Sequence, residues 1–292
     1  MGVVTITDII AIIFDFDDTL VPDSLTALLS SASIDTKDFW EAKVPKLIQE
    51  GYDPPSAYLK LLLDNIGDGK PLGPLTNAKL RQFGETLDSQ FFPGLPKFFE
   101  DVPALVKAEY KNIEVEFYII SGGLQAILEG SKIVRKYFKG AYGCQLAGDT
   151  EDGVLKYVRR SVTFTEKTRY LFEINKGVDQ RESSTNPYLV NAAKEPKDRR
   201  IPFPNVIYLG DGLTDIPCFS TVQLFGGKAF GVFNPTDRDK AKQAFEKMLI
   251  PHRVISTHSP RYSEDDDLGS LLRAATIKIC LDIEVGRKTA IR

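Results

Sequence analysis

The sequence has few cysteines, and their spacing forms no pairs. Its 292 residues include only Cys144, Cys218 and Cys280, which lie far apart in the chain. An odd number without close spacing excludes a disulfide framework and gives no cysteine-based zinc or redox motif. We therefore expect free thiols, as in a protein of a reducing compartment.

Positive charge is not in excess either. The formal net charge is −3 at pH 7, which leaves no basic footprint for nucleic acid. A basic stretch at residues 194–200 is interrupted by acids and a proline, which is typical of a solvated loop. The sequence therefore predicts no nucleic acid partner.

Long apolar runs are missing as well. No stretch of about 18 apolar residues occurs, and no basic leader precedes a long apolar segment near the amino terminus. We therefore expect a cytoplasmic protein without a membrane partner, whereas the oligomeric state is not indicated. With 42% hydrophobic and 26% charged residues, the chain can bury a full α/β core and a smaller accessory domain.

The most informative stretch that is present spans residues 9–20. An isoleucine-rich run at residues 9–14 predicts a fully buried parallel strand, and Asp15 and Asp17 follow it directly. Side chains alternate along an extended chain, so both carboxylates would point to the same side. Because ligands of open α/β sheets collect at the carboxyl ends of strands, this layout favours a site for a metal and a phosphate.

A second acidic strand end lies far downstream. The apolar run at residues 205–209 ends in Gly210-Asp211-Gly212, and Asp215 follows. Carboxylates at adjacent strand ends would repel each other by roughly 4 kcal/mol per pair at about 4 Å and an effective dielectric near 20. A cation relieves this repulsion, and Mg²⁺ prefers oxygen ligands together with substrate phosphate. The residues therefore predict an Mg²⁺ site.

Two further features lie between these strand ends, which makes four motifs in all. In chain order the motifs are Asp15-x-Asp17-x-Thr19, an apolar strand at residues 117–120 ending in Ser121-Gly122-Gly123, Lys167, and Gly210-Asp211-Gly212-x-Thr214-Asp215. This series resembles the haloacid dehalogenase superfamily, and within it the phosphatases similar to phosphoserine phosphatase. The resemblance covers residues 9–233, and the stretch beyond them is unmatched.

The resemblance implies a role for each position. Asp15 would be the nucleophile that forms an aspartyl-phosphate, and Asp17 would act as acid and base on a small-molecule phosphomonoester. The Mg²⁺ ligands would be Asp15, Asp17 through its backbone carbonyl, Asp211 and, close behind, Asp215. The phosphate-binding residues would be Thr19, Ser121, Gly122 and Lys167.

Each motif also has a simpler structural explanation. Residues 17–19 are of types that cap helices, and residues 121–123 suit a turn between a strand and a helix. A lysine in the first turn of a helix is usually solvated, so Lys176, at the other end of the same segment, competes with Lys167 as the phosphate-binding residue. Asp149 and Asp152 lie in turn-like sequence between two β-like runs and need no metal.

Residues 22–92 predict a helical cap domain inserted after the first strand. Apolar residues recur at helical spacing in four stretches that glycines and prolines separate, at residues 24–31, 36–50, 55–66 and 76–91. Such a cap would cover the site, exclude water and select the leaving group. The alternative is a helical appendage that packs elsewhere. Residues 1–21 and 93–292 would form the phosphatase core.

The remaining sequence alternates helix and strand, which predicts an α/β fold with a Rossmann-like parallel sheet and helices on both faces. We expect helices at residues 95–110, 124–138, 236–248 and 268–283, and strands at residues 113–120, 206–209 and 229–233. Acids at residues 265–267 suit the start of the last helix. The polar segment at residues 179–203 lacks periodicity, so an ordered loop, a lid and a mobile segment stay open.

The substrate is the least determined part of the prediction. No arginine occurs between residues 22 and 76, which disfavours phosphoserine because arginine binds carboxylates best. Aromatic residues of the predicted cap could line a pocket for a flat leaving group, but their helical spacing favours the core; they are Phe39, Trp40, Tyr52 and Tyr58.

Other functions stay open at this point. A phosphotransferase or mutase would use the same aspartyl-phosphate, and a non-catalytic protein would bind a phosphate ligand without turnover. A carbon–halogen hydrolase is disfavoured, since the resemblance implies that such members lack an acid at the position of Asp17.

Overall fold

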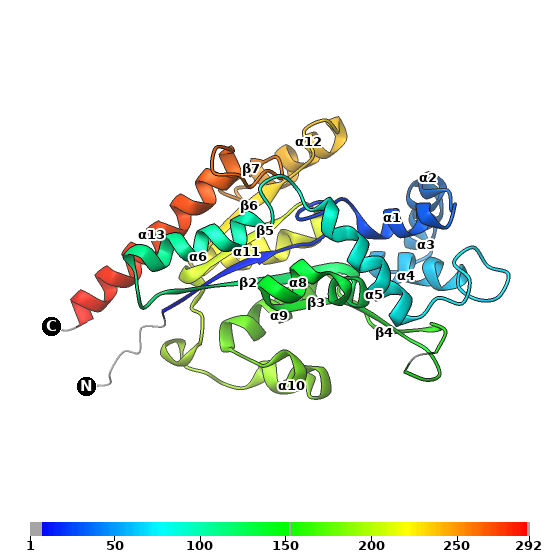
Figure 1. Ribbon diagram of the computed structural model, residues 1–292, viewed down its shortest axis with the longest axis horizontal. Helices are drawn as coiled ribbons and strands as arrows, with labels where there is room; N and C mark the ends of the chain where they lie inside the picture. Colours follow the sequence, from blue (N-terminus) through cyan, green and yellow to red (C-terminus); the bar gives the residue numbers. More distant parts are fainter. Residues whose placement is uncertain (1–7, 152, 291–292) are drawn as a thin grey trace.

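The computed structural model describes residues 8–151 and 153–290. Seven strands within this part of the chain form one sheet, in the order β4-β3-β2-β1-β5-β6-β7. Neighbours pair in parallel, except that β3 and β4 are antiparallel. The strands are β1 (Ile9–Phe14), β2 (Glu114–Leu124), β3 (Phe138–Ala147), β4 (Tyr157–Arg160), β5 (Val206–Gly210), β6 (Lys228–Val232) and β7 (Ser256–His258). The sheet, with its helices, confirms the predicted α/β fold (Figure 1).

The predicted helical stretches between β1 and β2 are helical. They lie beyond the carboxyl end of β1, at the right of Figure 1, and only the last of these helices returns along the sheet. The elements are α1 (Ser24–Ser31), α2 (Thr36–Asp38), the π-helical η1 (Phe39–Lys43), α3 (Val44–Gln49), α4 (Pro54–Asp64), α5 (Asn77–Thr86), η2 (Leu87–Gln90) and α6 (Lys97–Glu109).

The helices after β2 follow the predicted alternation with strands. They are α7 (Gln125–Gly130), α8 (Lys132–Tyr137), α9 (Phe164–Lys176), α10 (Gln180–Thr185), α11 (Ile216–Leu224), α12 (Arg238–Ala244) and α13 (Asp267–Ala290). Shorter turns of helix are η3 (Pro187–Asn191), η4 (Pro196–Asp198), η5 (Phe203–Asn205), η6 (Leu213–Asp215) and η7 (Phe245–Leu249). The polar segment at residues 179–203 therefore contains helical turns.

Two predicted boundaries are wrong around the end of β2. The strand runs to Leu124, past the predicted end at residue 120, because Leu124 still pairs with Cys144 of β3. The helix predicted over residues 124–138 is instead two helices that separate at Ser131. The Ser131 hydroxyl accepts the N–H of Val134 at 3.1 Å and so caps α8 as a new helix.

The alternation of side chains along β1 places helices on both faces of the sheet. Phe14 packs against Phe98 and Phe99 of α6, with ring centroids 6.5 and 6.0 Å away. The next side chain, Asp15, contacts Lys167 of α9. Because neighbouring side chains of a strand point to opposite faces, α9 lies on the face opposite α6. There α9 and α11 pack against each other.

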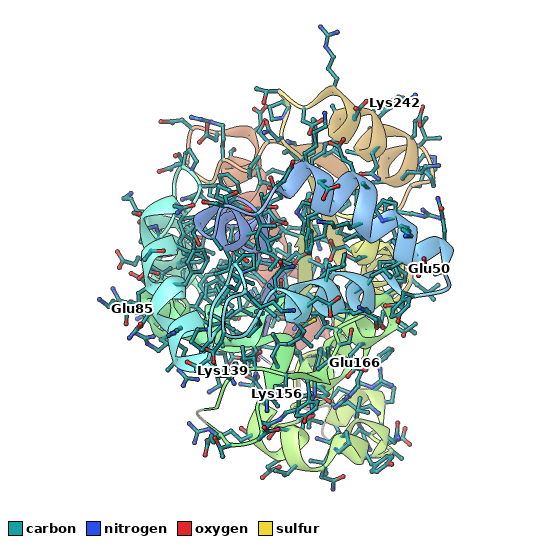
Figure 2. All side chains as sticks on the ribbon, turned by 90° about the vertical axis from the view of Figure 1, so that its right-hand side faces the viewer. Glu50, Glu85, Lys139, Lys156, Glu166 and Lys242 are labelled. Carbon is teal, nitrogen blue, oxygen red and sulfur yellow. The ribbon has the colours of Figure 1, made fainter. Side chains whose placement is uncertain are left out.

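The remaining predictions concern loops, thiols and termini. The predicted hairpin joins β3 to β4, and its Asp149 forms an ion pair with Lys156, whereas Asp152 and residues 1–7 lie outside the described residues. The three cysteines are free and buried, as expected. Within the described residues, no helix combines the length and apolar composition that a membrane span requires. Charged residues such as Glu50, Glu85 and Lys242 lie at the rim of the molecule (Figure 2).

Candidate active site

Asp15 lies at the carboxyl end of β1, where the sheet still fixes its backbone. Its N–H donates to the carbonyl oxygen of Leu209 at 2.8 Å, which continues the pairing of β1 with β5. One carboxylate oxygen accepts the N–H of Phe16 at 2.7 Å, and the other accepts Lys167 Nζ at 2.6 Å. These contacts hold a buried carboxylate in one orientation at the strand end.

Lys167 lies in the first turn of α9 and is buried. Its Nζ donates to Asp15 at 2.6 Å and to Asp215 at 2.8 Å. Burial alone would lower the pKa of Lys167, but the two carboxylates raise it above its ordinary value, so the amine is charged. A buried charge needs such partners. The solvated position that a first-turn lysine usually takes is therefore wrong for Lys167.

Lys176, the alternative lysine, lies at the other end of the same helix. Its Nζ donates to the backbone carbonyls of Val190 and Ala192, at 2.6 and 3.0 Å. Lys176 also lines a separate hollow with Tyr188 of η3. Its hydrogen bonds therefore tie the segment after α10 to α9 and do not reach the acidic cluster.

Asp215 is the most completely partnered acid of the site. One oxygen accepts Lys167 Nζ at 2.8 Å and the Tyr208 hydroxyl at 2.7 Å, and the other accepts the N–H of Gly212 at 3.2 Å. A Cβ at Gly210 would lie 2.4 Å from the Asp215 carboxyl carbon, so this strand end requires glycine. The sequence analysis did not identify Tyr208 as a residue of the site. The only indication in the sequence is that a tyrosine interrupts the apolar strand that precedes Gly210-Asp211.

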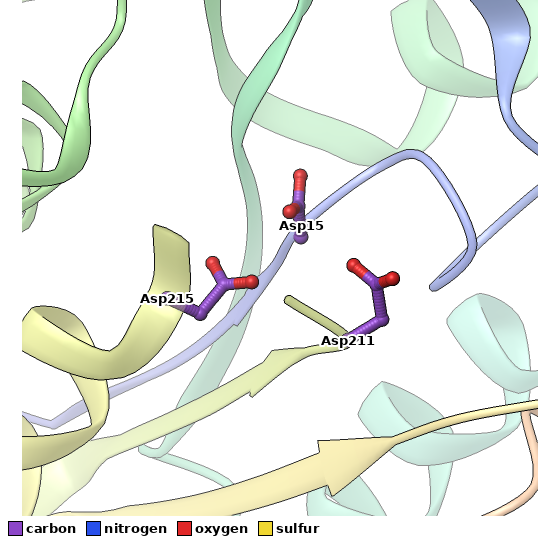
Figure 3. Close-up of side chains that lie close together, drawn as sticks. All are labelled: Asp15, Asp211 and Asp215. Carbon is purple, nitrogen blue, oxygen red and sulfur yellow. The ribbon is translucent and has the colours of Figure 1, made fainter. Parts of the chain in front are cut away.

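Three carboxylates converge in front of β1 and β5. Asp15, Asp211 and Asp215 can each offer one oxygen within 4.8 Å of the others. Figure 3 shows that Asp15 comes from the end of β1, Asp211 from the loop after β5 and Asp215 from the start of the next helix. Burial raises the pKa of Asp15 to about 7, with Lys167 opposing and Asp215 adding to the rise. Burial, followed by Asp15 and Asp215, also raises the pKa of Asp211 well above its usual range.

The donor set of this cluster fits a hard divalent cation. Within the described residues, no donor is hydrogen-bonded to the Asp211 carboxylate, and the ammonium of Lys167 pairs only with Asp15 and Asp215. Oxygen-only ligands around an excess of negative charge are what Mg²⁺ prefers. The side chain of Asp17 is not part of this group, so its predicted metal contact through the backbone carbonyl stays a prediction.

Asp17 faces a different wall of the site. One carboxylate oxygen accepts the N–H of Ser24 at 2.8 Å. A Cβ at Gly123 would lie 2.5 Å from the other oxygen, so the glycine makes room for this acid. Burial, with a further contribution from Asp23, raises the pKa of Asp17 to about 8. The N-cap of α1 is Asp23, so the alternative in which residues 17–19 cap a helix is wrong.

The strand end after Ile120 supplies the polar backbone opposite Asp15. Ser121 is buried, and its hydroxyl oxygen accepts the N–H of Gly123 at 2.9 Å. The carbonyl of Gly122 accepts the Tyr58 hydroxyl at 2.7 Å, which ties α4 to this strand end. The alternative of a plain strand-to-helix turn is wrong, because residues 121–123 are still part of β2.

The loop after Asp17 is held by residues from the last quarter of the chain. Asp18 has a left-handed backbone with φ of 54°, and its carboxylate forms an ion pair with Lys240 of α12. The carbonyl of Thr19 accepts the hydroxyl of Tyr262 at 2.7 Å. The Thr19 hydroxyl is buried without a hydrogen-bond partner among the described residues. Neither Lys240 nor Tyr262 was expected from the sequence.

These residues enclose one cavity of 170 Å³. Its sheet side carries the predicted acids and the glycines of β2, and its helix side carries residues from α1, η1 and α4. The lining residues are Asp15, Asp17, Asp18, Asp23, Leu25, Trp40, Tyr58, Ser121, Gly122, Gly123, Asp211 and Thr214.

The four aromatic residues that were expected to form core differ in their surroundings. Phe39 is buried, whereas Tyr52 is 40% exposed. Trp40 and Tyr58 pack against the core and also line the cavity. Their polar atoms fix them there, because Trp40 Nε1 donates to the Thr26 hydroxyl at 2.8 Å and Tyr58 bonds to β2. Helical spacing alone could not distinguish a core face from a face that meets the site.

Known proteins resemble this chain in sequence and in fold. No family model matches the chain. An uncharacterized protein of Borreliella burgdorferi is 27% identical over 300 residues, covering 94% of this chain and 98% of that protein.

Solved structures extend the comparison to the fold. A HAD family hydrolase of Salmonella enterica is similar with a TM-score of 0.50 and 18% identity, over 80% of this chain and 65% of the other. A probable phosphoserine phosphatase of Vibrio cholerae gives 0.53 and 14%, over 95% of this chain and 68% of the other. The chain thus spans about two thirds of each structure. The protein has the fold of haloacid dehalogenase family hydrolases, as its motifs predicted.

Proposed function

We propose that this protein is an Mg²⁺-dependent phosphatase that hydrolyses a small-molecule phosphomonoester through an aspartyl-phosphate. The observation that supports this most directly is the convergence of Asp15, Lys167, Asp211 and Asp215 at one sheet edge, with Asp17 in the same cavity. Asp15 and Asp211 follow two different strands, β1 and β5. The fold itself does not require buried carboxylates at these positions, so their excess favours a function.

Asp15 is the proposed nucleophile. An oxygen of its carboxylate attacks phosphorus in line while the bond from phosphorus to the leaving oxygen breaks, and water later cleaves the aspartyl-phosphate. The hydrogen bonds from Phe16 and Lys167 pre-set the orientation of the carboxylate, so that little reorganisation is needed for attack. The ammonium of Lys167 also reduces the repulsion between Asp15 and the phosphoryl oxygens.

Asp17 is the proposed general acid and base. Its raised pKa, to about 8, keeps a proton on the carboxyl group at neutral pH, which suits protonation of a departing alkoxide. The resulting carboxylate can then take a proton from the water that attacks the intermediate. The hydrogen bond from Ser24 fixes its orientation toward the cavity.

Asp15, Asp211 and Asp215 would hold Mg²⁺, with the backbone carbonyl of Asp17 as a further proposed ligand. When bound, the cation neutralises part of the negative charge of the nucleophile and phosphate. Ser121 lies across the cavity, where its hydroxyl hydrogen is available to a phosphate oxygen. Gly122 presents backbone without a side chain at the same wall.

We further propose that residues 22–92 are a cap over a core of residues 1–21 and 93–292, in a cytoplasmic enzyme. The helices of this segment supply Trp40 and Tyr58 to the cavity wall, which fits a cap that excludes water and selects the leaving group. Its partner would be a small phosphomonoester, with no nucleic acid involved.

Phosphate release from a panel of phosphomonoesters tests this proposal. The panel contains phosphoserine, sugar phosphates, nucleotides and pyridoxal phosphate, each with Mg²⁺ and with chelator. We expect release that needs Mg²⁺ and that falls on the order of 10⁴-fold in Asp15→Asn, the scale seen when residues of covalent catalysis are removed. Asp53→Asn is the matched control, because the side chain of Asp53 makes no capping hydrogen bond. More than a tenth of wild-type turnover in Asp15→Asn would exclude Asp15 as the nucleophile.

A further inference from the structure

The cavity contains an unusual balance of charge for a phosphate site. Five aspartates line it, and no lysine, arginine or histidine is among the lining residues. Lys167 and Lys240 are nearby, but each is already paired with an acid of the site. Even with Asp17 protonated and a divalent cation bound, the five remaining carboxylates, Asp215 included, face only four positive charges. A substrate whose leaving group is also anionic would add to this excess.

The helix side of the cavity is aromatic. Trp40 and Tyr58 meet edge to face, with ring centroids 5.7 Å apart and planes at 62°. Trp40 Nε1 and the Tyr58 hydroxyl already donate to Thr26 and Gly122. The rings therefore offer the cavity their π-systems and no free donor. Such rings attract a cation through their quadrupole, most strongly where water is excluded.

Asp23 places a carboxylate on the same side. One of its oxygens accepts the N–H of Thr26 at 2.5 Å as the N-cap of α1. The side chain of Thr26 also hydrogen-bonds this carboxylate, and Asp23 lines the cavity. An acid beside two aromatic rings is the combination that recognises an ammonium group.

The size of the cavity restricts what can carry that charge. Its 170 Å³ is well below the roughly 300–1,000 Å³ of pockets for drug-sized ligands. A leaving group of a few heavy atoms fits within this space, whereas a larger one would extend out of it into solvent. Because no arginine is present between residues 22 and 76, the helices offer no fork for a substrate carboxylate either.

We propose that the substrate is the phosphate monoester of a small alcohol that carries a positive charge, either a primary or a quaternary ammonium. Trp40, Tyr58 and Asp23 bind the cationic end, and the phosphate faces Asp15. The inference rests on the proposed function, since it names the substrate class of that same site. Water and the ester yield inorganic phosphate and the free amino alcohol, with no other reactant.

Matched esters test this inference. The wild-type enzyme with Mg²⁺ is assayed on phosphocholine, phosphoethanolamine, phosphoserine and 3,3-dimethylbutyl phosphate, the neutral isostere of phosphocholine. We expect kcat/KM for the better cationic ester to exceed that for the neutral isostere and for phosphoserine by at least about tenfold. Which cationic ester is better distinguishes a quaternary from a primary ammonium.

The controls separate failure of this inference from failure of the proposed function. p-Nitrophenyl phosphate reports on phosphatase chemistry without a cationic group. Hydrolysis that depends on Asp15 but shows no preference for the cationic esters would contradict the inference alone. Absence of Asp15-dependent hydrolysis with every ester, p-nitrophenyl phosphate included, would contradict both.

Two variants locate the selectivity. Asp23→Asn keeps an N-cap acceptor for α1 while it removes the charge, so the fold is preserved. We expect it, and Trp40→Leu, to lower the ratio of kcat/KM between cationic and neutral esters by roughly threefold to thirtyfold. Asp53→Asn, an exposed N-cap acid of the same segment, should leave that ratio at the wild-type value. An unchanged ratio in both Asp23→Asn and Trp40→Leu would overturn the assignment of these residues.

Discussion

The two ends of β2 hold buried charge in different ways. Near the amino end, both oxygens of Glu116 accept the guanidinium of Arg200 at 2.6 Å, and the Tyr118 hydroxyl adds a hydrogen bond at 2.6 Å. Beside the carboxyl end, three carboxylates of neighbouring strand ends converge, and the ammonium of Lys167 pairs with only two of them. One region is balanced by the chain itself, and the other is not.

This difference separates a structural charge from a functional one. A matched and fully hydrogen-bonded pair satisfies its own groups and needs no ligand. An excess of carboxylates raises the free energy of the folded protein unless a cation or a proton reduces it, and such clusters mark catalytic sites. Substitutions at the acidic end should therefore change activity and ligand response as well as stability, whereas substitutions at the Glu116–Arg200 end should change stability alone.

The largest effect is expected for Lys167→Met. It leaves Asp15 and Asp215 buried without their cation, which should cost about 3–5 kcal/mol in the free energy of unfolding and abolish most turnover. Denaturant unfolding, followed in parallel with phosphate release, measures both. Arg200→Met should cost about 1 kcal/mol, because the Arg200 side chain is 34% exposed, and should keep turnover within about twofold.

Lys176→Met is the control within the same helix. Lys176 donates only to backbone carbonyls of the segment after α10, so its loss should change stability by less than about 1 kcal/mol. If Lys176→Met and Lys167→Met proved equally damaging to turnover, the contrast between the two ends of α9 would be lost.

Asp17→Asn should reduce turnover of an alkyl phosphate by about 10²–10⁴ and reduce turnover of p-nitrophenyl phosphate less, because an activated leaving group needs less protonation. The pH dependence follows from the pKa of Asp17, which burial raises to about 8. The acid is protonated below that pH, so kcat for the alkyl ester should fall as pH rises through about 8. Equal losses of turnover on both esters would contradict the role of Asp17 as general acid. So would a fall of kcat at high pH that is unchanged in Asp17→Asn.

The chemical side of the site was predictable because its signals are local in sequence. Apolar runs that stop at Asp15 and at Asp211 indicate buried strands, and parallel strands bring their carboxyl ends to one edge of the sheet. Resemblance to a known series of motifs added Lys167, whose position no periodicity distinguishes from that of Lys176.

The other residues of the site depend on contacts between distant parts of the chain. Lys240 meets Asp18 across 222 positions, and nothing near either residue indicates the pair. Trp40 and Tyr58 have the helical spacing of core residues, and only tertiary packing turns them toward the cavity. The predicted end of β2 was wrong for the same reason, since pairing with β3 extends the strand through two glycines.

Mg²⁺ should stabilise the protein through the carboxylates at the carboxyl end of β2 and not through the Glu116–Arg200 pair at its amino end. Binding to the folded state alone raises stability by about 2.7 kcal/mol at a free concentration 100 times Kd. We expect Mg²⁺ to raise the Tm of the wild type and of Glu116→Gln. We expect no such rise in Asp211→Asn. Asp149→Asn is the control, because this hairpin acid pairs with Lys156. If Mg²⁺ still raised the Tm of Asp211→Asn, the metal would not bind at the proposed ligands.

The smallest effect is the acid sensitivity of the balanced end. Burial alone would raise the pKa of Glu116, but its hydrogen bonds from Arg200 and Tyr118 lower it below the ordinary value of 4.5. A lowered pKa contributes stability that is present above the unfolded value and is lost as pH falls through the folded one. The free energy of unfolding should therefore drop by about 1 kcal/mol as pH falls below 4.5, a modest figure because solvent screens the partly exposed Arg200. Glu116→Gln has no such carboxylate to protonate, so its unfolding curves at pH 6 and pH 3 should differ less than those of the wild type. If the curves of the wild type and of Glu116→Gln changed equally between pH 6 and pH 3, the charge of the Glu116–Arg200 pair would contribute nothing to stability.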